Sequence, residues 1–252
     1  MPEIIIVLPA YNEMENVEKL VSRWVALDEE LSDKFNLALK IVIVDDGSAD
    51  DTAVIGKRLA EELANVTIIS HDVNKGLGAA LKTGVMYSLS ERLDSAFVCV
   101  MDCDNTHNPA YVIKMLENQK STSSDVVIAS RYRKNAKTKG VNGIRLMASG
   151  GARYMFSALL GVKGVRDYTC GYRLYTREIL ERANKRFGGD MITENGFTCM
   201  VEFLYKLHKC GAIFAEIPFE LRYDFKEGKS KMKVFRTAVN SIALVFRLKK
   251  IK

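Results

Sequence analysis

Phe97-Val98-Cys99-Val100-Met101-Asp102-Cys103-Asp104 is an apolar run that ends in two carboxylates separated by one residue. A short continuous apolar run is typical of a strand buried on both faces of a parallel sheet. Because alternate residues of an extended segment point the same way, Asp102 and Asp104 can face one ligand from the strand end. Such a pair suits Mg²⁺ or Mn²⁺, which completes its shell with water and substrate phosphate oxygens. The simpler interpretation is a solvated turn, which Asp also favours.

Similar apolar runs alternate with helix-like segments through the first half of the chain. Strands are predicted over residues 4–8, 41–44, 66–69, 97–101 and 126–129. Apolar residues recur at helical spacing over 16–31, 52–63, 78–89 and 111–116. This order predicts an α/β fold in which helices flank a mostly parallel sheet and the crossovers are right-handed.

The second half of the chain is less regular. A helix is predicted over 144–160, and strands over 172–175 and 212–217 enclose a helix near 199–209. Since no linker-like segment separates these elements, we expect one domain over residues 1–230, followed by a basic amphipathic helix over 231–252.

Composition excludes several classes of protein. Hydrophobic residues make up 48% and charged residues 27% of the 252 residues, which is ordinary for a globular chain. The five cysteines are an odd number without a CxxC pair, which argues against a zinc site or a disulfide framework. No signal peptide begins the sequence, and no apolar run approaches the ~20 residues that span a bilayer. We therefore expect a cytoplasmic protein that meets a membrane only at its surface.

Polar clusters follow three of the predicted strands. They are Pro9-Ala10-Tyr11-Asn12-Glu13, Asp45-Asp46-Gly47-Ser48 and Asp102-Cys103-Asp104. Because parallel strands end at one edge of a sheet, where ligands of such folds bind, we expect the clusters to converge. One of the consecutive aspartates can accept hydrogen bonds from a base or ribose. At the next strand-to-helix junction, Asn74-Lys75-Gly76-Leu77-Gly78 offers backbone N–H groups and Lys75 to a phosphate.

Six motifs together resemble family 2 glycosyltransferases. In chain order they are Pro9-Ala10-Tyr11-Asn12-Glu13, Val44-Asp45-Asp46-Gly47-Ser48, Asn74-Lys75-Gly76, Asp102-Cys103-Asp104, Ala129-Ser130-Arg131-Tyr132 and Thr169-Cys170-Gly171-Tyr172-Arg173. Within that family the chain is most similar to the polyprenyl-phosphate (dolichol-phosphate) mannosyltransferase and glucosyltransferase branch. The resemblance covers nearly the whole chain, and it implies the Rossmann-like GT-A fold.

The resemblance also implies roles for individual residues. The nucleotide pocket would be lined by Pro9, Tyr11, Glu13, Val44 and Asp46. The diphosphate and a divalent cation, Mg²⁺ or Mn²⁺, would meet Asp102, Cys103 and Asp104. Arg131 would contact the donor phosphates or the acceptor phosphate, so Asp102, Asp104 and Arg131 form the expected catalytic set.

Two departures from the branch's pattern concern the phosphates and the metal. Arg222 and Lys231 resemble the basic residues that close over the phosphates, but Arg222 lies three residues farther from Ser230-Lys231 than in the pattern, and Lys226 can stand in for it. Thr106 occupies the place of a glutamine that is associated with the metal. Thr106 is therefore the third expected metal residue, and metal preference can differ from the branch.

The chemistry of a phosphate acceptor agrees with this resemblance. A phosphate is already an anion at pH 7, so no side chain has to deprotonate it. The enzyme instead needs cations that hold like-charged phosphates together. Candidates are Arg131, Arg133, Arg173 and Lys231, although a solvated surface role is an equal interpretation for Arg133.

The predicted reaction moves a hexose from GDP-mannose or UDP-glucose to a polyprenyl phosphate, with inversion at the anomeric carbon. Three alternatives stay open from sequence. A glycan hydroxyl acceptor would need a general base, for which Asp167 or Glu202 are candidates. A nucleotidyltransferase also uses paired aspartates, and a nucleotide-sugar sensor would bind without turnover.

Two segments predict contact with the cytoplasmic face of a membrane. Residues 145–160 are apolar over much of a helix, and the chain from Gly228 onward carries eight Lys or Arg and no acidic residue. A basic amphipathic helix is typical of the surface of anionic lipid. The alternative is that both segments pack on the sheet or form a homodimer. A membrane-protein partner is a further expectation, and no nucleic acid is expected.

Overall fold

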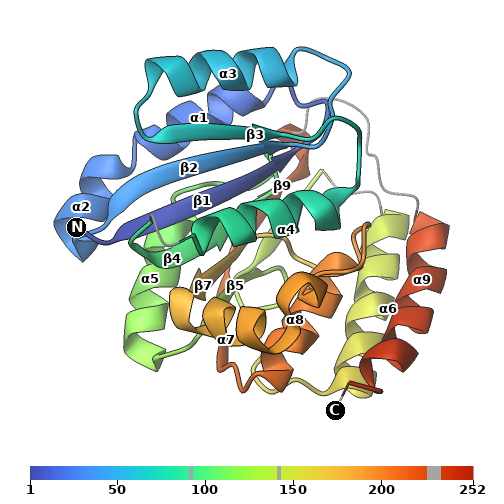
Figure 1. Cartoon of the computed structure of the whole chain (residues 1–252). Coiled ribbons are helices and arrows are strands. Elements are labelled where there is room, and N and C mark those ends of the chain that lie inside the picture. The colour runs from blue at the N-terminus through green and yellow to red at the C-terminus, as the bar shows by residue number, and fades with distance from the viewer. Residues whose placement is uncertain (91–92, 141–142, 226–233, 252) are drawn as a thin grey trace.

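The computed structural model describes residues 1–90, 93–140, 143–225 and 234–251, and its centre is a seven-stranded sheet (Figure 1). The strand order is β3-β2-β1-β4-β7-β5-β8, and only β7 runs antiparallel to its neighbours. The strands are β1 (Glu3–Ala10), β2 (Ala38–Asp45), β3 (Val66–Ser70), β4 (Ser95–Val100), β5 (Val126–Ser130), β7 (Arg173–Thr176) and β8 (Phe214–Pro218). The predicted mostly parallel α/β sheet is confirmed.

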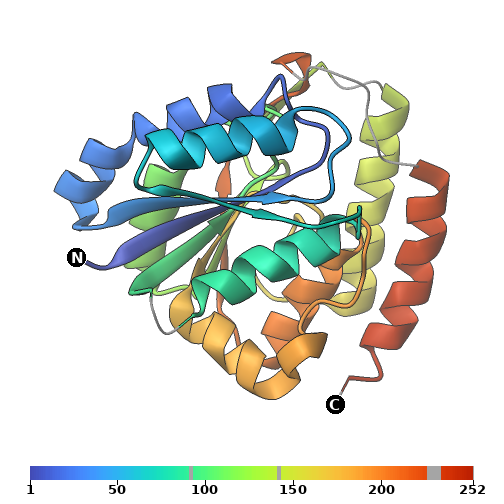
Figure 2. The ribbon, with the colours of Figure 1, turned by 45° about the horizontal axis from the view of Figure 1, so that its top comes forward.

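Helices cover both faces of this sheet (Figure 1). They are α1 (Val17–Val25), α2 (Asp28–Phe35), α3 (Thr52–Glu62), α4 (Leu77–Ser88), α5 (Tyr111–Thr122), α6 (Gly143–Leu160), α7 (Arg177–Phe187), α8 (Cys199–Lys209) and α9 (Val234–Leu248). Helices α4, α7 and α8 lie on one face, and α1 and α5 lie on the other (Figures 1 and 2). Helix α4 approaches closely because Gly84 has no side chain: a Cβ there would lie 2.2 Å from Cγ1 of Val7.

The prediction of one helix over 16–31 is wrong. The structure has α1 and α2 instead, separated at Ala26 and Leu27. Only Leu31 is buried in α2, so its apolar stripe is too thin to continue the buried face of α1. Helix α7 and a small parallel sheet of β6 (Lys137–Lys139) and β9 (Glu220–Arg222) were not predicted.

Helices α6 and α9 lie side by side at the end of the sheet where the parallel strands finish (Figures 1 and 2). Helix α9 also contacts α8, and its residues Leu244, Val245 and Leu248 are buried. The C-terminal segment, predicted as a separate basic helix, therefore packs on the main body through its apolar side. None of the helices within the described residues is long and apolar enough to cross a membrane.

Candidate active site

Loops from the ends of β1 and β2 interlock at the carboxyl edge of the sheet. The Asn12 backbone N donates to Oγ of Ser48 over 2.9 Å, and the Ala49 backbone N donates to Oδ1 of Asn12 over 2.8 Å. Asn12 has a positive φ of 51°, a conformation that Asn tolerates better than most residues. The first two polar clusters of the sequence therefore converge, as predicted.

Asp46 connects this edge to the loop before α4. Its carboxylate is buried, and it accepts from the backbone N of Lys75 (3.0 Å) and of Gly76 (2.8 Å). Gly47, with a φ of +67°, permits the approach, because a Cβ there would lie 2.4 Å from the carbonyl carbon of Val73. Asp46 is thus held by the protein on both oxygens.

The predicted phosphate site at Asn74-Lys75-Gly76 is wrong in one respect: the backbone N–H groups of Lys75 and Gly76 point to Asp46 and are not open to a ligand. The start of α4 is also covered, since the Gly78 backbone N donates to the carbonyl of Asn195 over 3.1 Å. The Lys75 side chain itself is exposed, so it stays available at the edge of this loop.

The aspartates after β4 lie as their alternation predicts. Cys103 is buried at 2% exposure, whereas Asp102 and Asp104 on either side are partly exposed. The side chain of Cys103 therefore faces the core, and the contact with the diphosphate that the resemblance implied for Cys103 stays a prediction. Oδ1 of Asp104 accepts from the Thr106 hydroxyl over 2.6 Å and from its backbone N over 3.2 Å. Thr106 thus orients the Asp104 carboxylate, and Thr106 itself is buried, with 3% of its surface exposed.

The two aspartates fit a divalent cation that is shared with a substrate. Within the described part of the chain, no three His, Cys, Asp or Glu side chains gather into a metal site. Mg²⁺ and Mn²⁺ need no such cage, because one or two carboxylates suffice when substrate phosphates and water complete the shell. A donor set of Asp102 and Asp104 has the composition of that kind of site.

The absence of a side chain at Gly171 leaves space for the carboxylate of Asp102. A Cβ at residue 171 would lie 2.7 Å from Oδ1 of Asp102, which is closer than non-bonded atoms approach. We expect Gly171→Ala to displace this carboxylate and to lower kcat by about 10²-fold, the cost typical of a misplaced catalytic group. Steady-state rates measured across a Mn²⁺ titration check this. The matched control is Gly189→Ala, where a Cβ would meet only the tip of Lys82 at 3.8 Å, and an equal loss there would contradict the prediction.

The other residues expected at the nucleotide pocket are placed as follows. Tyr11 and Glu13 are partly exposed at the end of β1, and the Glu13 backbone N donates to Oγ1 of Thr52 over 2.8 Å. Pro9 pairs in register with Val44 inside the sheet. Val44 is fully buried beneath α4, where it faces Gly84, so its side chain cannot line a pocket. The contact expected of Val44 therefore stays a prediction that concerns its backbone.

Arg131, directly after β5, binds a buried carboxylate. Its Nε and Nη2 donate to the two oxygens of Asp167 over 2.8 and 2.6 Å, and Nη2 also donates to Thr169 over 2.6 Å. Burial alone would raise the pKa of Asp167, but the charge and hydrogen bonds of Arg131 outweigh burial and hold that pKa below its ordinary value. The Arg131 side chain as a whole is 20% exposed.

The remaining cations differ from expectation. Arg173 is fully buried and donates to the carbonyls of Met200 (2.8 Å) and Tyr168 (2.7 Å), so it cannot reach a phosphate. The prediction that Arg173 helps to hold the phosphates is therefore wrong. Arg133 lies 3.2 Å from the buried carboxylate of Glu216, which makes it part of an ion pair. Lys231, Lys226 and the Gly228–Ser230 stretch fall outside the described residues.

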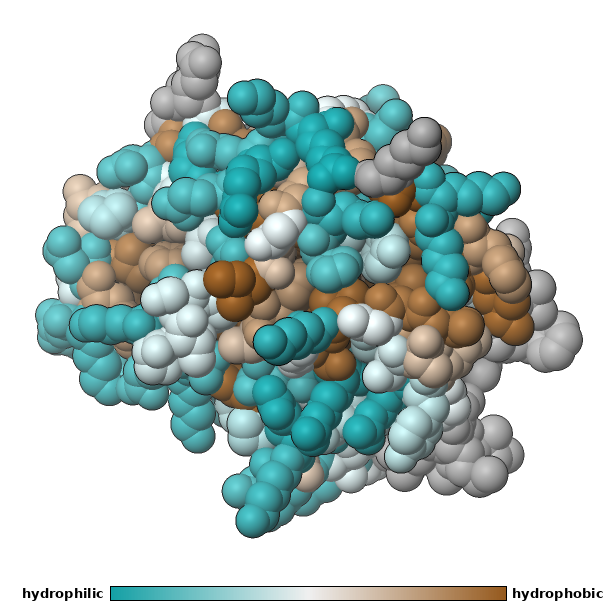
Figure 3. Space-filling model, turned by 90° about the horizontal axis from the view of Figure 1, so that it is seen from below, coloured by the Kyte–Doolittle hydropathy of each residue, from teal (hydrophilic) through white to brown (hydrophobic). Residues whose placement is uncertain are grey.

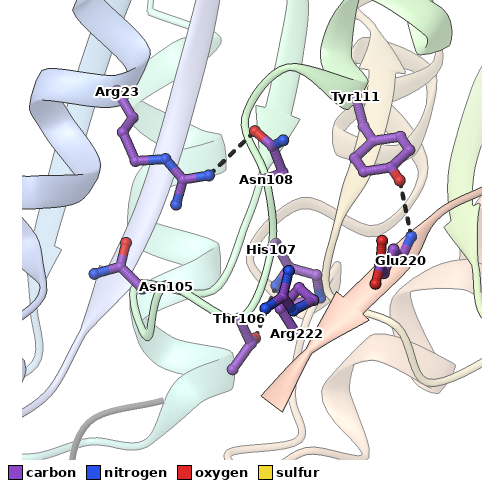
Figure 4. A pocket seen from close by; sticks show the side chains of 8 residues that line it. All are labelled: Arg23, Asn105, Thr106, His107, Asn108, Tyr111, Glu220 and Arg222. Carbon is purple, nitrogen blue, oxygen red and sulfur yellow. Dashed lines mark hydrogen bonds between the residues drawn. The ribbon is translucent and has the colours of Figure 1, made fainter. Parts of the chain in front are cut away.

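Arg222 contacts the loop that follows β4. Its backbone N donates to the carbonyl of Thr106 over 3.0 Å, and its guanidinium pairs with Asp224 at 2.8 Å. Together with Arg23 of α1, it lines a pocket of about 110 Å³ beside residues 105–108 (Figure 4). The volume suits a few water molecules or a small anion. The backbone hydrogen bond between Arg222 and Thr106 means that β9 supports the loop that carries Asp102 and Asp104.

The two candidate bases for a hydroxyl acceptor are both occupied. Asp167 is bound by Arg131, as described above. Glu202 is 2% exposed and accepts from the backbone N of Thr193 and Glu194 and from Nζ of Lys206 over 2.6 Å. Burial works to raise the pKa of Glu202, but these hydrogen bonds outweigh it and lower that pKa. Neither acid has the raised pKa of a general base poised near neutrality.

Sequence reasoning missed several partners. His71 contacts Asp46, Asp167 holds Arg131, and Gly171 lies against Asp102. Of these three residues, only Gly171 had a sequence signal, because it lies inside the Thr169–Arg173 motif. His71 and Asp167 meet their partners through contacts between distant segments of the chain.

Comparison with known proteins agrees with this geometry. The sequence profile described as glycosyl transferase family 2 matches residues 5–183. The polyprenol monophosphomannose synthase of Mycolicibacterium smegmatis is 29% identical over 90% of this chain and 80% of its own length. The dolichol-phosphate mannosyltransferase of Pyrococcus furiosus is 30% identical over 98% of this chain, which spans 64% of that relative.

Solved structures share the fold at lower identity. Glucosyl-3-phosphoglycerate synthase from Mycobacterium tuberculosis, in complex with Mn²⁺, UDP and phosphoglyceric acid, superposes with a TM-score of 0.69 at 19% identity, covering 100% of this chain and 80% of that one. Mannosyl-3-phosphoglycerate synthase from Rubrobacter xylanophilus gives 0.62 at 16% identity, covering 98% and 75%.

Proposed function

Because the chain belongs to glycosyl transferase family 2, we propose that it moves a hexose from GDP-mannose or UDP-glucose to a polyprenyl phosphate. Support for this acceptor comes from the two relatives described as a polyprenol monophosphomannose synthase and a dolichol-phosphate mannosyltransferase. The structural observation that carries it is the state of Asp167 and Glu202. Both acids that a hydroxyl acceptor would recruit are ion-paired inside the protein, and a phosphate acceptor needs neither.

The proposed role of the site residues is to stabilise the negative charge of the phosphates. Asp102 and Asp104 would hold Mg²⁺ or Mn²⁺ together with the donor diphosphate, and such a cation would supply positive charge to the departing nucleoside diphosphate when bound. Arg131, fixed by Asp167, would present its partly exposed side chain to a phosphate. Since Asp167 already orients it, little reorganisation is needed when charge develops.

The proposed step is a single displacement. An oxygen of the acceptor phosphate attacks the anomeric carbon, the bond from that carbon to the diphosphate oxygen breaks, and the electron pair leaves with the nucleoside diphosphate. The configuration at the anomeric carbon is inverted. No proton has to be removed from the nucleophile.

The test is a matrix of radiolabelled donors and acceptors. GDP-mannose and UDP-glucose are each incubated with Mn²⁺ or Mg²⁺ and either an undecaprenyl phosphate or a soluble glycan. Transfer of label to the lipid phosphate with release of nucleoside diphosphate is expected. Label only in the glycan, or release of pyrophosphate, would refute the proposal.

A surface that binds the membrane would bring the active site close to this lipid acceptor. Figure 3 shows hydrophobic side chains gathered on the right of the molecule, the side on which α6 and α9 lie in Figure 1. The most exposed large apolar residues of α6 and α9 are Tyr154 (69%), Phe246 (65%) and Ile242 (50%). Exposed apolar residues on helices beside the carboxyl edge suit insertion into the interface of a bilayer. We propose peripheral binding to the cytoplasmic face through this side.

We expect the double substitution of Ile242→Ser and Phe246→Ser to weaken sedimentation with anionic vesicles by about tenfold or more, because each buried large apolar side chain contributes ~1.5–3 kcal/mol. Ile213→Ser is the control, since Ile213 is 57% exposed but precedes β8 at the opposite edge of the sheet. Unchanged vesicle binding by the double variant would remove this side from the proposal.

A further inference from the structure

His71 is a buried histidine that links Asp46 to helix α4. It follows β3, and its backbone N donates to the carbonyl of Asp45 over 2.9 Å. The side chain is 8% exposed. Its Nδ1 lies 2.7 Å from Oδ1 of Asp46, and its Nε2 lies 2.9 Å from the hydroxyl of Thr83 on α4. The ring therefore spans the end of β2 and a helix packed on the sheet.

The hydrogen-bond partners assign the proton on the ring. An ionised carboxylate only accepts, so Nδ1 of His71 must carry the hydrogen that it shares with Asp46. In the neutral ring Nε2 then accepts from the Thr83 hydroxyl. Each nitrogen thus has a defined partner, and the orientation of the imidazole is fixed.

Asp46 has little acceptor capacity left. A carboxylate offers about four acceptor positions. Oδ1 receives His71 and the Lys75 backbone N, and Oδ2 receives the Gly76 backbone N. The remaining position therefore lies on Oδ2. Asp46 is 3% exposed, and its other three acceptor positions are already used by the protein.

We propose that His71 is a positioning residue for the donor: it locks the rotamer of Asp46 so that the last lone pair on Oδ2 receives an N–H or O–H of the nucleoside. This inference rests on the proposed function, because it takes Asp46 as part of a nucleotide pocket. The Lys75–Gly76 loop, in which Lys75 is exposed and Gly76 is partly buried, also donates to Asp46. Thr83 supplies the fixed support, since it belongs to a helix packed against β1 and β2.

Two substitutions separate positioning from stability. An Asn amide nitrogen occupies the place of Nδ1, so His71→Asn keeps the donor to Asp46 and loses Thr83. A Gln amide reaches the place of Nε2, so His71→Gln keeps Thr83 and loses Asp46. We expect His71→Gln to raise the Kd of GDP or UDP with Mn²⁺ about tenfold by calorimetry, and His71→Asn to stay within about twofold of the parent protein.

The outcomes are distinguishable. Absence of binding by the parent protein to both nucleotides refutes the proposed function itself. Binding by the parent protein with equal Kd values for the Asn and Gln variants refutes only the role of His71, whatever their urea unfolding midpoints. If His71→Gln does not fold, Thr83→Val frees the ring without touching Asp46, and an unchanged nucleotide Kd in that variant would also overturn the inference.

Discussion

Asp104→Asn is expected to lower kcat by about 10³-fold at saturating donor, with the fold intact. The amide oxygen of Asn can still accept from the Thr106 hydroxyl and backbone N, which hold the carboxylate now. What disappears is the negative charge that a divalent cation requires of its protein ligand. The loss should therefore appear in turnover and in the Mn²⁺ concentration for half-maximal rate, and the unfolding midpoint should stay unchanged.

The control for this prediction is Asp33→Asn. Asp33 is exposed on α2, on the part of the chain that does not contribute to the carboxyl edge, and its substitution removes the same charge from the protein. It should leave both rate and metal dependence unaltered. Normal turnover by Asp104→Asn would exclude the aspartate pair as the catalytic metal site.

Asp167→Asn should lower the free energy of unfolding by about 3–5 kcal/mol, the cost of leaving a buried charge without its partner. Asp167 is fully buried and receives three hydrogen bonds from Arg131. Urea unfolding measures the effect. Glu30→Gln breaks the exposed pair with Lys34 and should cost less than about 1 kcal/mol, so equal costs would contradict the assignment of a buried, structurally coupled pair.

This prediction has a defined pH dependence. The pKa of Asp167 is lower in the folded protein than the ordinary value of 3.8, so the pair's stabilisation is fully present above that value and is lost as the pH falls through the folded pKa. The difference in unfolding free energy between parent and Asp167→Asn should be constant from about pH 5 to 8 and shrink in stronger acid. A difference that grew with acid would mean that the folded pKa is raised.

Local pattern was enough to predict most of the sheet. The strands over 4–8, 41–44, 66–69, 97–101 and 126–129 are continuous apolar runs, and burial on both faces of a parallel sheet requires that composition. The convergence of the polar clusters followed from the same pattern, because parallel strands share one carboxyl edge. The break between α1 and α2 was missed, because it depends on how little of α2 the core covers.

The residue roles depended on more than pattern. A sequence shows that Arg131 and Arg173 are cations after or within apolar runs, but not which of them faces a carboxylate and which is enclosed by carbonyls. Strand β7 decides this, since it enters the sheet antiparallel between β4 and β5 and carries Arg173 into the interior. The same insertion brings Gly171 against Asp102.

The sequence by itself determined the α/β class, the parallel direction of the early strands and the edge at which acidic and basic side chains collect, because hydrophobic periodicity is a local property. Only the tertiary structure decided that Asp46 is held by His71 and the Lys75–Gly76 loop, and that Asp167 neutralises Arg131. These partners lie 25 to 36 residues apart. Contacts at that separation depend on how helices and loops pack, which no local pattern encodes.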